Sequence, residues 1–187
     1  MPQIRDPEVS ILAACSETLR EEYGELDIWM DSPFAWIKMR PSRQVGAIGE
    51  KLVSGYLATK GFDVTRSPDS DADRLVNGVR AEIKFSTLWK NGSYKFQQLR
   101  DQNYAFAICL GIGPFAAHCW VLPKSVLMER WQTGGSGIGS QHGGKAGRDT
   151  AWLHVNPNSI HGWLQEWGGD LSKVTPLVSK ITGQSPL

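Results

Sequence analysis

The sequence predicts an α/β fold, bordering on α+β, in which helices flank a mixed central β-sheet. Strand and helix patterns alternate along much of the 187-residue chain, as they do in sheets covered by helices. Two nearly continuous apolar runs, at 104–111 and 116–122, indicate strands that are buried on both faces. In addition, Asn77-Gly78 separates two short runs of strand character, which is the strongest short-range signal for a β-hairpin.

The length and composition of the chain favour a single globular domain spanning residues 1–187. A chain of this length can bury a substantial core, and its 41% apolar and 21% charged residues are ordinary for a globular protein. We divide it into an N-terminal helix and arm (1–41), a core (42–122) and a glycine-rich loop (133–149). No apolar run is long enough to cross a bilayer and no signal-peptide pattern follows Met1, so we expect no membrane association.

The cysteine and charge patterns bear on location and partners. The three cysteines are too few and too scattered for a disulfide framework, and they lack metal-ligand spacing. We therefore expect them to be buried thiols in a reducing cytoplasm: Cys15, Cys109 and Cys119. Residues 1–31 hold eight acidic and two basic side chains, a net charge of −6, and the remainder carries +7. This asymmetry is compatible with a polyanionic partner, and equally with a solvated acidic helix on a mildly basic domain.

Helices are predicted where apolar stripes coincide with end signals. Pro7 suits the first turn of a helix over 7–22, and Ser42 is a good N-cap for a helix that runs to about Lys60. Residues 24–41 have apolar side chains without a clear period, so this arm either covers the core or forms a subunit interface. Further helices are expected at 94–102, 123–131, 159–167 and 171–181.

Strands are predicted before, within and after the hairpin. The expected strands are 62–66, 74–76, 79–85, 104–111, 116–122 and 152–155. The two-residue turn fixes the register of the hairpin, so that Val76 faces Val79 and Asp73 faces Glu82. Residues directly opposite in an antiparallel pair have Cβ atoms roughly 5 Å apart. The two carboxylates are therefore expected to lie close together.

The same hairpin predicts a metal site. The period of two places Glu82 and Lys84 on one face of the strand, and the apolar side chains on the other: Val79, Ala81, Ile83 and Phe85. Two carboxylates as close as Asp73 and Glu82 repel each other unless a cation lies between them. Mg²⁺ prefers carboxylate oxygens and keeps several waters, so it suits such a site.

A glycine-rich segment at 133–149 precedes the last predicted strand. No strand comes directly before its glycines and no Gly-Lys-Ser/Thr occurs, which argues against a phosphate-binding P-loop. Four polar or basic side chains among and after the glycines could contact a DNA groove: Gln141, His142, Lys145 and Arg148. The alternative is a surface loop without such a role.

Taken in order along residues 42–122, these residues resemble a known superfamily. Glu50 on a helix, Asp73, Glu82-Ile83-Lys84 and then Gln97-Gln98 resemble the PD-(D/E)xK nucleases, the restriction-endonuclease-like superfamily. The resemblance implies that Asp73 and Glu82 bind Mg²⁺ and that Glu50 supports the metal shell. It also implies that Lys84 orients or polarises the attacking water, in a catalytic core formed by 42–122.

Further roles follow from the same resemblance. A glutamine after the motif sometimes assists catalysis in the superfamily, and here we assign Gln97, with Gln98 as the alternative. The expected DNA contacts are Lys90, Lys95, Gln98, Gln141, His142, Lys145 and Arg148.

One departure affects the choice of the aspartate. The Pro-Asp of the motif is absent at Asp73, which follows Ala72, and a literal Pro-Asp occurs at Asp69. Asp71 would also reach Lys84 if the hairpin continued further. We choose Asp73 because the turn places it opposite Glu82.

The resemblance implies a Mg²⁺-dependent endonuclease that cuts double-stranded DNA, most closely a type II restriction endonuclease. A structure-specific junction or repair nuclease is the alternative within the fold, and a DNA-binding module without turnover is the alternative outside enzymes. Because one site cuts one strand, we expect a homodimer on a palindromic site. The expected interface is the arm at 24–41, with its exposed-looking aromatic residues Trp29, Phe34 and Trp36.

Overall fold

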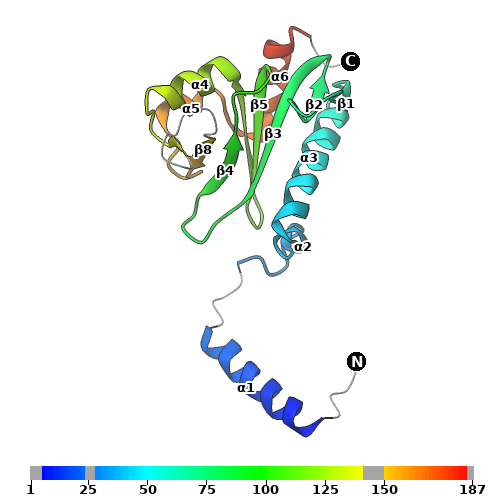
Figure 1. Ribbon diagram of the computed structural model, residues 1–187, viewed down its shortest axis with the longest axis vertical. Helices are drawn as coiled ribbons and strands as arrows, with labels where there is room; N and C mark the ends of the chain where they lie inside the picture. Colours follow the sequence, from blue (N-terminus) through cyan, green and yellow to red (C-terminus); the bar gives the residue numbers. More distant parts are fainter. Residues whose placement is uncertain (1–5, 24–27, 141–149, 185–187) are drawn as a thin grey trace.

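A six-stranded mixed sheet lies at the centre of the computed structural model, which describes residues 6–23, 28–140 and 150–184 (Figure 1). In spatial order its strands are β1 (Val64–Arg66), β2 (Arg74–Val76), β3 (Val79–Thr87), β5 (Phe106–Ile112), β6 (Ala117–Pro123) and β9 (Gly168–Asp170). Strands β3 and β5 are parallel, and the other neighbouring pairs are antiparallel. The predicted α/β class, with a mixed central sheet flanked by helices, is confirmed.

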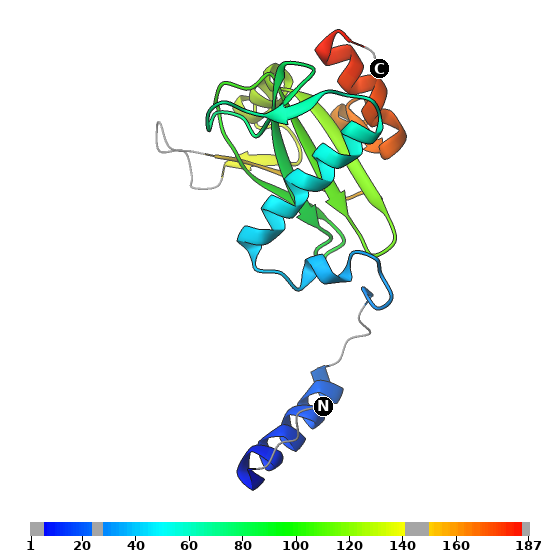
Figure 2. The same cartoon turned by 90° about the vertical axis from the view of Figure 1, so that its right-hand side faces the viewer.

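A second, three-stranded antiparallel sheet covers one face of the first. Its order is β4 (Tyr94–Leu99), β8 (Ala151–Val155) and β7 (Ile138–Ser140). The helices are α1 (Pro7–Tyr23), α2 (Ala35–Lys38), α3 (Ser42–Thr59), α4 (Lys124–Gln132), α5 (Gly162–Gln165) and α6 (Val174–Thr182), with a 3₁₀ turn η1 (Leu171–Lys173). Figure 2 shows α3 running diagonally across the other face of the central sheet.

The core has two layers, one on each side of β5, which is buried along its whole length. Ile108 and Leu110 point into the layer beneath α3 and α6, where they meet Val53 of α3. Ala107 and Cys109 point into the other layer, which contains Phe96 of β4, Trp120 of β6 and Leu153 of β8. This alternation explains the continuous apolar run in the sequence, because both faces of β5 are covered.

The helix predicted from 42 to about 60 is present as α3, but its start differs from the prediction. Pro41 is the N-cap, with φ −56° and ψ 145°, and Ser42 is the first helical residue without a side-chain cap. The Pro41 carbonyl accepts hydrogen bonds from the backbone N–H groups of Gln44 and Val45, at 2.8 and 3.1 Å. The extended proline therefore begins the helix directly, which leaves the serine hydroxyl no capping role.

The helix predicted at 94–102 is wrong, because residues Tyr94–Leu99 form strand β4. Tyr94 and Phe96 alternate inward and pack on Trp120, with ring centroids 6.2 and 6.0 Å away. A β-bulge follows, in which Gln98 has a φ of 57° and the pairing shifts before Leu99. The extra residue turns Leu99 back into the core, so the sequence does not show a simple period of two.

The C-terminal region also differs from prediction. The helix expected at 159–167 is reduced to one turn, α5, and strand β9 follows it. Gly168 has a φ of 150°, and a Cβ there would lie 2.2 Å from the Cys119 carbonyl oxygen. Only glycine permits this close pairing with β6, and a strand with two glycines has no apolar pattern to reveal it. The helix expected at 171–181 is present as η1 and α6.

Two expectations for individual side chains are wrong. Trp29 of the arm is only 4% exposed and belongs to the core layer beneath α3, together with Ile37. The arm, in its described part from residue 28, thus covers the core, while Trp36 remains 47% exposed. Cys15 is exposed on α1, whereas the other two cysteines are buried as expected. Within the described ranges, no helix is both long enough and apolar enough to span a membrane.

Candidate active site

The β2–β3 hairpin has the predicted turn and register. Asn77 and Gly78 have φ values of 49° and 78°, and Val76 pairs with Val79. Beyond the paired residues, the Asp73 backbone N–H donates to the Ala81 carbonyl at 3.1 Å. The Asp73 side chain then accepts a hydrogen bond at Oδ2 from the backbone N–H of Ile83, at 2.7 Å. The carboxylate is thereby fixed against β3 next to Glu82, as the turn predicts.

Helix α3 brings a second carboxylate to this strand. Gly49 of α3 lies against Phe85 of β3 so closely that a Cβ would be 2.2 Å from the Phe85 Cβ. The next residue, Glu50, is half-buried, and its side chain lies within the electrostatic reach of Asp73 and Lys84. The glycine therefore sets the distance between α3 and β3.

Glu82 and Lys84 form a close ion pair on the face of β3 that is turned away from α3. The Lys84 Nζ lies 2.6 Å from Glu82 Oε1, and Glu82 is only 6% exposed. Burial raises the pKa of Glu82, the ammonium of Lys84 opposes this effect, and the charge of Asp73 adds to it. Lys84 lines the cleft that is described below. Glu82 is buried and does not belong to the described lining of that cleft.

Arg74, the first residue of β2, contacts both the Glu50 side chain on α3 and the backbone of Asp73. Its Nη2 lies 3.4 Å from Glu50 Oε2, its Nη1 donates to the Asp73 carbonyl oxygen at 2.7 Å, and its Nε donates to Ser54 Oγ at 3.0 Å. Burial raises the pKa of Glu50 and the negative charge of Asp73 raises it further, whereas Arg74 and Lys84 lower it.

Sequence reasoning missed Arg74, although the register held a signal. The residue pairs with Ala81, whose side chain points into the core layer beneath α3. A side chain opposite Ala81 therefore leaves the sheet on the α3 side, where Glu50 and Ser54 are one helical turn apart.

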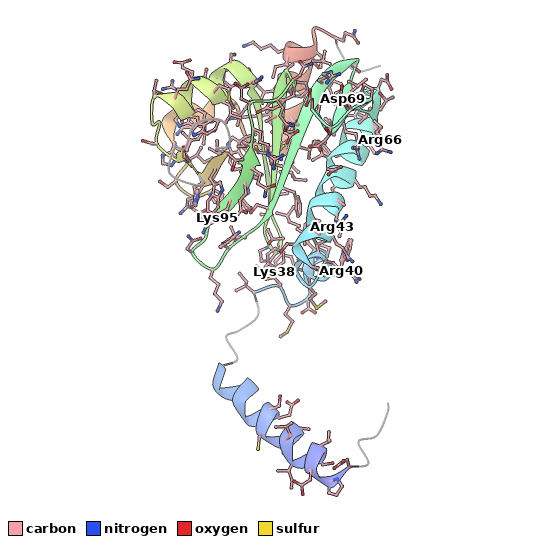
Figure 3. All side chains as sticks on the ribbon, in the orientation of Figure 1. Lys38, Arg40, Arg43, Arg66, Asp69 and Lys95 are labelled. Carbon is pink, nitrogen blue, oxygen red and sulfur yellow. The ribbon has the colours of Figure 1, made fainter. Side chains whose placement is uncertain are left out.

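Glu50, Asp73 and Lys84 line one part of a cleft of about 940 Å³ between α3, β3 and β4. The cleft is lined by two acidic and five basic side chains: Glu50, Asp73, Lys38, Arg40, Lys84, Lys90 and Lys95. Figure 3 shows Lys38, Arg40 and Arg43 near the α2–α3 end of the molecule, and Lys95 on the β4 side. The excess of positive charge suits a polyanion such as the phosphate backbone of a nucleic acid.

The cleft brings together three of the seven residues expected to bind DNA: Lys90, Lys95 and Gln98. Gln97, the glutamine expected to assist catalysis, lines it as well. Sequence reasoning missed Lys38 and Arg40, because the arm has no period that shows which side chains point inward. Four other predicted contacts lie outside the described residues: Gln141, His142, Lys145 and Arg148.

The two alternative aspartates lie outside the described lining of the cleft. Asp69 accepts two hydrogen bonds from Arg80, at 2.9 and 2.6 Å, and those bonds hold the pKa of Asp69 below its usual value. The Asp71 backbone N–H donates to Asp69 Oδ1 at 3.1 Å. Neither belongs to the described lining of the cleft, and Figure 3 shows Asp69 far from Lys95 and Lys38. Asp73 is the aspartate that lies near Glu50 and Lys84.

The donor set suits a hard divalent cation. In the described ranges, no three His, Cys, Asp or Glu side chains are close enough to form a ready-made metal-binding cluster. Glu50, Asp73 and Glu82 nevertheless supply carboxylate oxygens alone, which are the ligands that Mg²⁺ prefers. The charge of Asp73 raises the pKa of both glutamates, so a bound cation would relieve this repulsion.

No protein-family profile and no curated protein matches the sequence. Among solved structures, a bacterial homing endonuclease is similar, with 16% sequence identity and a TM-score of 0.40 over 63% of this chain and 76% of that one. At this level of similarity, the comparison assigns neither chemistry nor site residues to this chain.

Proposed function

We propose that this protein is a Mg²⁺-dependent endonuclease that hydrolyses phosphodiester bonds in double-stranded DNA, with the whole chain acting as one nuclease domain. The observation that carries the proposal is the meeting of three elements beside a basic cleft. Asp73 precedes β2, Glu82 and Lys84 lie on β3, and Glu50 comes from α3. Their order and roles resemble those of the PD-(D/E)xK nucleases, and a type II restriction endonuclease is the closest functional class.

In phosphodiester hydrolysis, the carboxylates, Lys84 and Gln97 would have separate roles. Asp73, Glu82 and Glu50 would hold Mg²⁺, which supplies a bound water of lowered pKa and neutralises charge on the phosphate. The backbone N–H of Ile83 keeps the Asp73 carboxylate in place. Lys84, whose side chain is 19% exposed, reaches the cleft and can orient a water or stabilise negative charge that develops on phosphate oxygens. Gln97 would assist from the bulge of β4.

The remaining cations would position the DNA. Lys38 and Arg40 lie at the α2–α3 end of the cleft, and Lys90 and Lys95 lie at the β3–β4 end. Contacts of this kind bind phosphates without reading sequence. A homodimer, with one such cleft for each strand, would cut both strands of a two-fold symmetric site.

The assignment of the aspartate is tested by plasmid cleavage in Mg²⁺. Asp73→Ala should reduce cleavage by more than about a hundredfold, because changing even an outer-shell partner of a metal ligand costs 10- to 100-fold. Asp69→Ala is the matched control, since it removes an aspartate that pairs with Arg80 outside the cleft. Wild-type cleavage by Asp73→Ala, together with inactive Asp69→Ala, would overturn the assignment.

The products separate this proposal from its alternatives. Discrete plasmid fragments indicate sequence-specific restriction. Preference for branched DNA indicates a structure-specific junction or repair nuclease. Binding without cleavage in Mg²⁺ indicates a DNA-binding module of the same fold.

A further inference from the structure

A tryptophan is presented at the mouth of the cleft by the turn between β3 and β4. Trp89 lines the cleft beside Lys90 and is 44% exposed. The Trp89 backbone N–H donates to the Ser93 carbonyl at 3.0 Å, and the Gly92 N–H donates to the Trp89 carbonyl at 2.9 Å. Asn91 Oδ1 accepts hydrogen bonds from the N–H and hydroxyl of Ser93, at 3.2 and 2.7 Å. The turn is therefore tied together by its own groups, which hold the backbone that carries the indole.

A cation lies directly over this indole. The Lys95 Nζ is 3.8 Å from the centroid of the Trp89 ring. Lys38 also lies over a tryptophan, Trp29, but that residue is only 4% exposed and packs in the hydrophobic core. Trp89 differs because it is a large exposed aromatic group inside a basic cleft. Aromatic side chains in basic grooves are the platforms on which unpaired bases stack, with the neighbouring ammonium groups on the phosphates.

We propose that Trp89 stacks on an unpaired base, so that the cleft takes duplex DNA with unpaired nucleotides beside the scissile phosphate. The inference rests on the proposed function for the identity of the polymer, and its substrate class favours the structure-specific nuclease over restriction of a fully paired site. Trp89 follows Lys84 by five residues, which is at most about 17 Å along an extended chain. A base on the ring is thus a few nucleotides from the candidate reaction site, and its phosphate lies within reach of Lys90 or Lys95.

Binding in Ca²⁺ tests the inference without requiring turnover. Fluorescence anisotropy would compare a blunt duplex, the same duplex with an unpaired overhang, and the overhang strand alone. Wild-type protein should bind the overhang duplex more tightly than the blunt duplex by roughly five- to a hundredfold, the range expected for one stacked base. Trp89→Leu should lose this preference, and Trp89→Phe should retain most of it because it keeps an aromatic face.

Phe115→Leu is the matched control, because Phe115 is an aromatic residue that is 70% exposed and is not part of the described cleft lining. It should keep the wild-type preference. Equal binding of the blunt and overhang duplexes by wild type, or an unchanged preference in Trp89→Leu, would overturn the inference. Tight binding of the overhang strand alone would support stacking and show that the duplex part is dispensable. If wild type never cleaves in Mg²⁺ but Trp89→Leu loses the preference, the nuclease proposal fails and the stacking site stands.

Discussion

At the scale of single residues, the site depends on carboxylates that the fold keeps largely out of water. Glu82 is buried behind Lys84, and Glu50 is half-buried beside Arg74. Each carboxylate has a raised pKa because burial disfavours its charged form, and nearby cations oppose the effect: Arg74 and then Lys84 at Glu50, and chiefly Lys84 at Glu82. Lys84 and Arg74 therefore give separate predictions.

Replacing Lys84 should affect chemistry more than DNA binding. Lys84→Ala removes the ammonium that reaches the cleft, and we expect cleavage to fall by about a hundred- to a thousandfold, as for the loss of a preorganised charge-stabilising donor. Binding in Ca²⁺, measured by gel shift, should change little. Lys90→Ala is a useful comparison, because this lysine also lines the cleft but is assigned to binding phosphate and not to the chemical step. A binding loss as large as the cleavage loss would make Lys84 a phosphate contact instead.

Replacing Arg74 should move the pH dependence of cleavage. Both glutamates must be ionised to hold a cation, and a raised pKa means that acidification protonates them at a higher pH than surface carboxylates. Arg74→Gln removes a charge that lowers the pKa of Glu50, so the acid limb of the pH–rate profile should shift to higher pH. We expect a loss of roughly tenfold near neutral pH, in the range found when a side chain that hydrogen-bonds a metal ligand is removed.

The pH profile separates positioning from a purely structural role of Arg74. Arg74→Lys keeps the charge and should restore the acid limb, even if the rate stays low because the hydrogen bonds to Ser54 and Asp73 are lost. An unshifted acid limb in Arg74→Gln would contradict a role for this arginine in the titration of Glu50.

At the scale of elements, the site is set by how closely α3 lies on β3. Gly49 is the contact point, and Glu50 follows it directly. Any side chain at Gly49 must push the helix away from Phe85, because the present spacing has no room for a Cβ. Stability and site geometry are therefore linked at one position.

Two glycines of the same helix give a matched test. Gly49→Ala should destabilise the fold by about 1–3 kcal/mol through overpacking, and it should reduce cleavage because Glu50 moves with the helix. Gly55→Ala should stabilise the protein by about 0.5–1 kcal/mol, since nothing lies within 4 Å of the added Cβ and alanine favours helix. Urea unfolding curves measure both changes, and equal effects of the two substitutions would refute the contact argument.

The elements differ in how far the sequence predicts them. The hairpin at 74–87 is predicted to the register because an Asn-Gly turn is a local signal that needs no tertiary contact. Strand β4 is not, because its bulge at Gln98 interrupts the alternation. Strand β9 is not predicted either, because its two glycines, one of which permits the close pairing with β6, carry no apolar pattern.

The site residues also differ in how far the sequence predicts their positions. Asp73, Glu82 and Lys84 are placed together by one turn and one strand, so their proximity is predictable. Arg74 reaches Glu50 only through the packing of α3, and Lys38 enters the cleft only because the arm folds back over the core. Their functional roles remain predictions, as does the binding of Mg²⁺.

At the scale of the whole molecule, the arm leaves apolar side chains on the surface. Trp29 and Ile37 are buried, but a second set from the same arm is exposed: Ile28, Met30, Trp36 and Met39. Four large apolar groups within one short segment favour a protein–protein contact. They are the residues through which we expect the proposed homodimer to form.

Sedimentation of the protein, free and on DNA, tests this interface. The 20.7 kDa chain should sediment as a dimer, at least when bound to its cleavage substrate. Trp36→Ser combined with Met39→Ser should shift it towards the monomer, because both substitutions remove an exposed apolar group from the arm. A monomer that stays 1:1 on its substrate would remove the dimer and favour nicking or sequential cutting.

The short pairing between β2 and β3 has a consequence for solubility. Strand β2 pairs with β3 only at Val79–Ala81, and in the described parts of the chain no strand pairs with that edge of β3 as far as Thr87. An unpaired edge is a template on which a foreign strand can add and start aggregation. Asp73 blocks one backbone N–H of this edge, and the lysines around it repel further chains of the same protein. The charges that would attract DNA therefore also oppose the addition of a foreign strand at this edge.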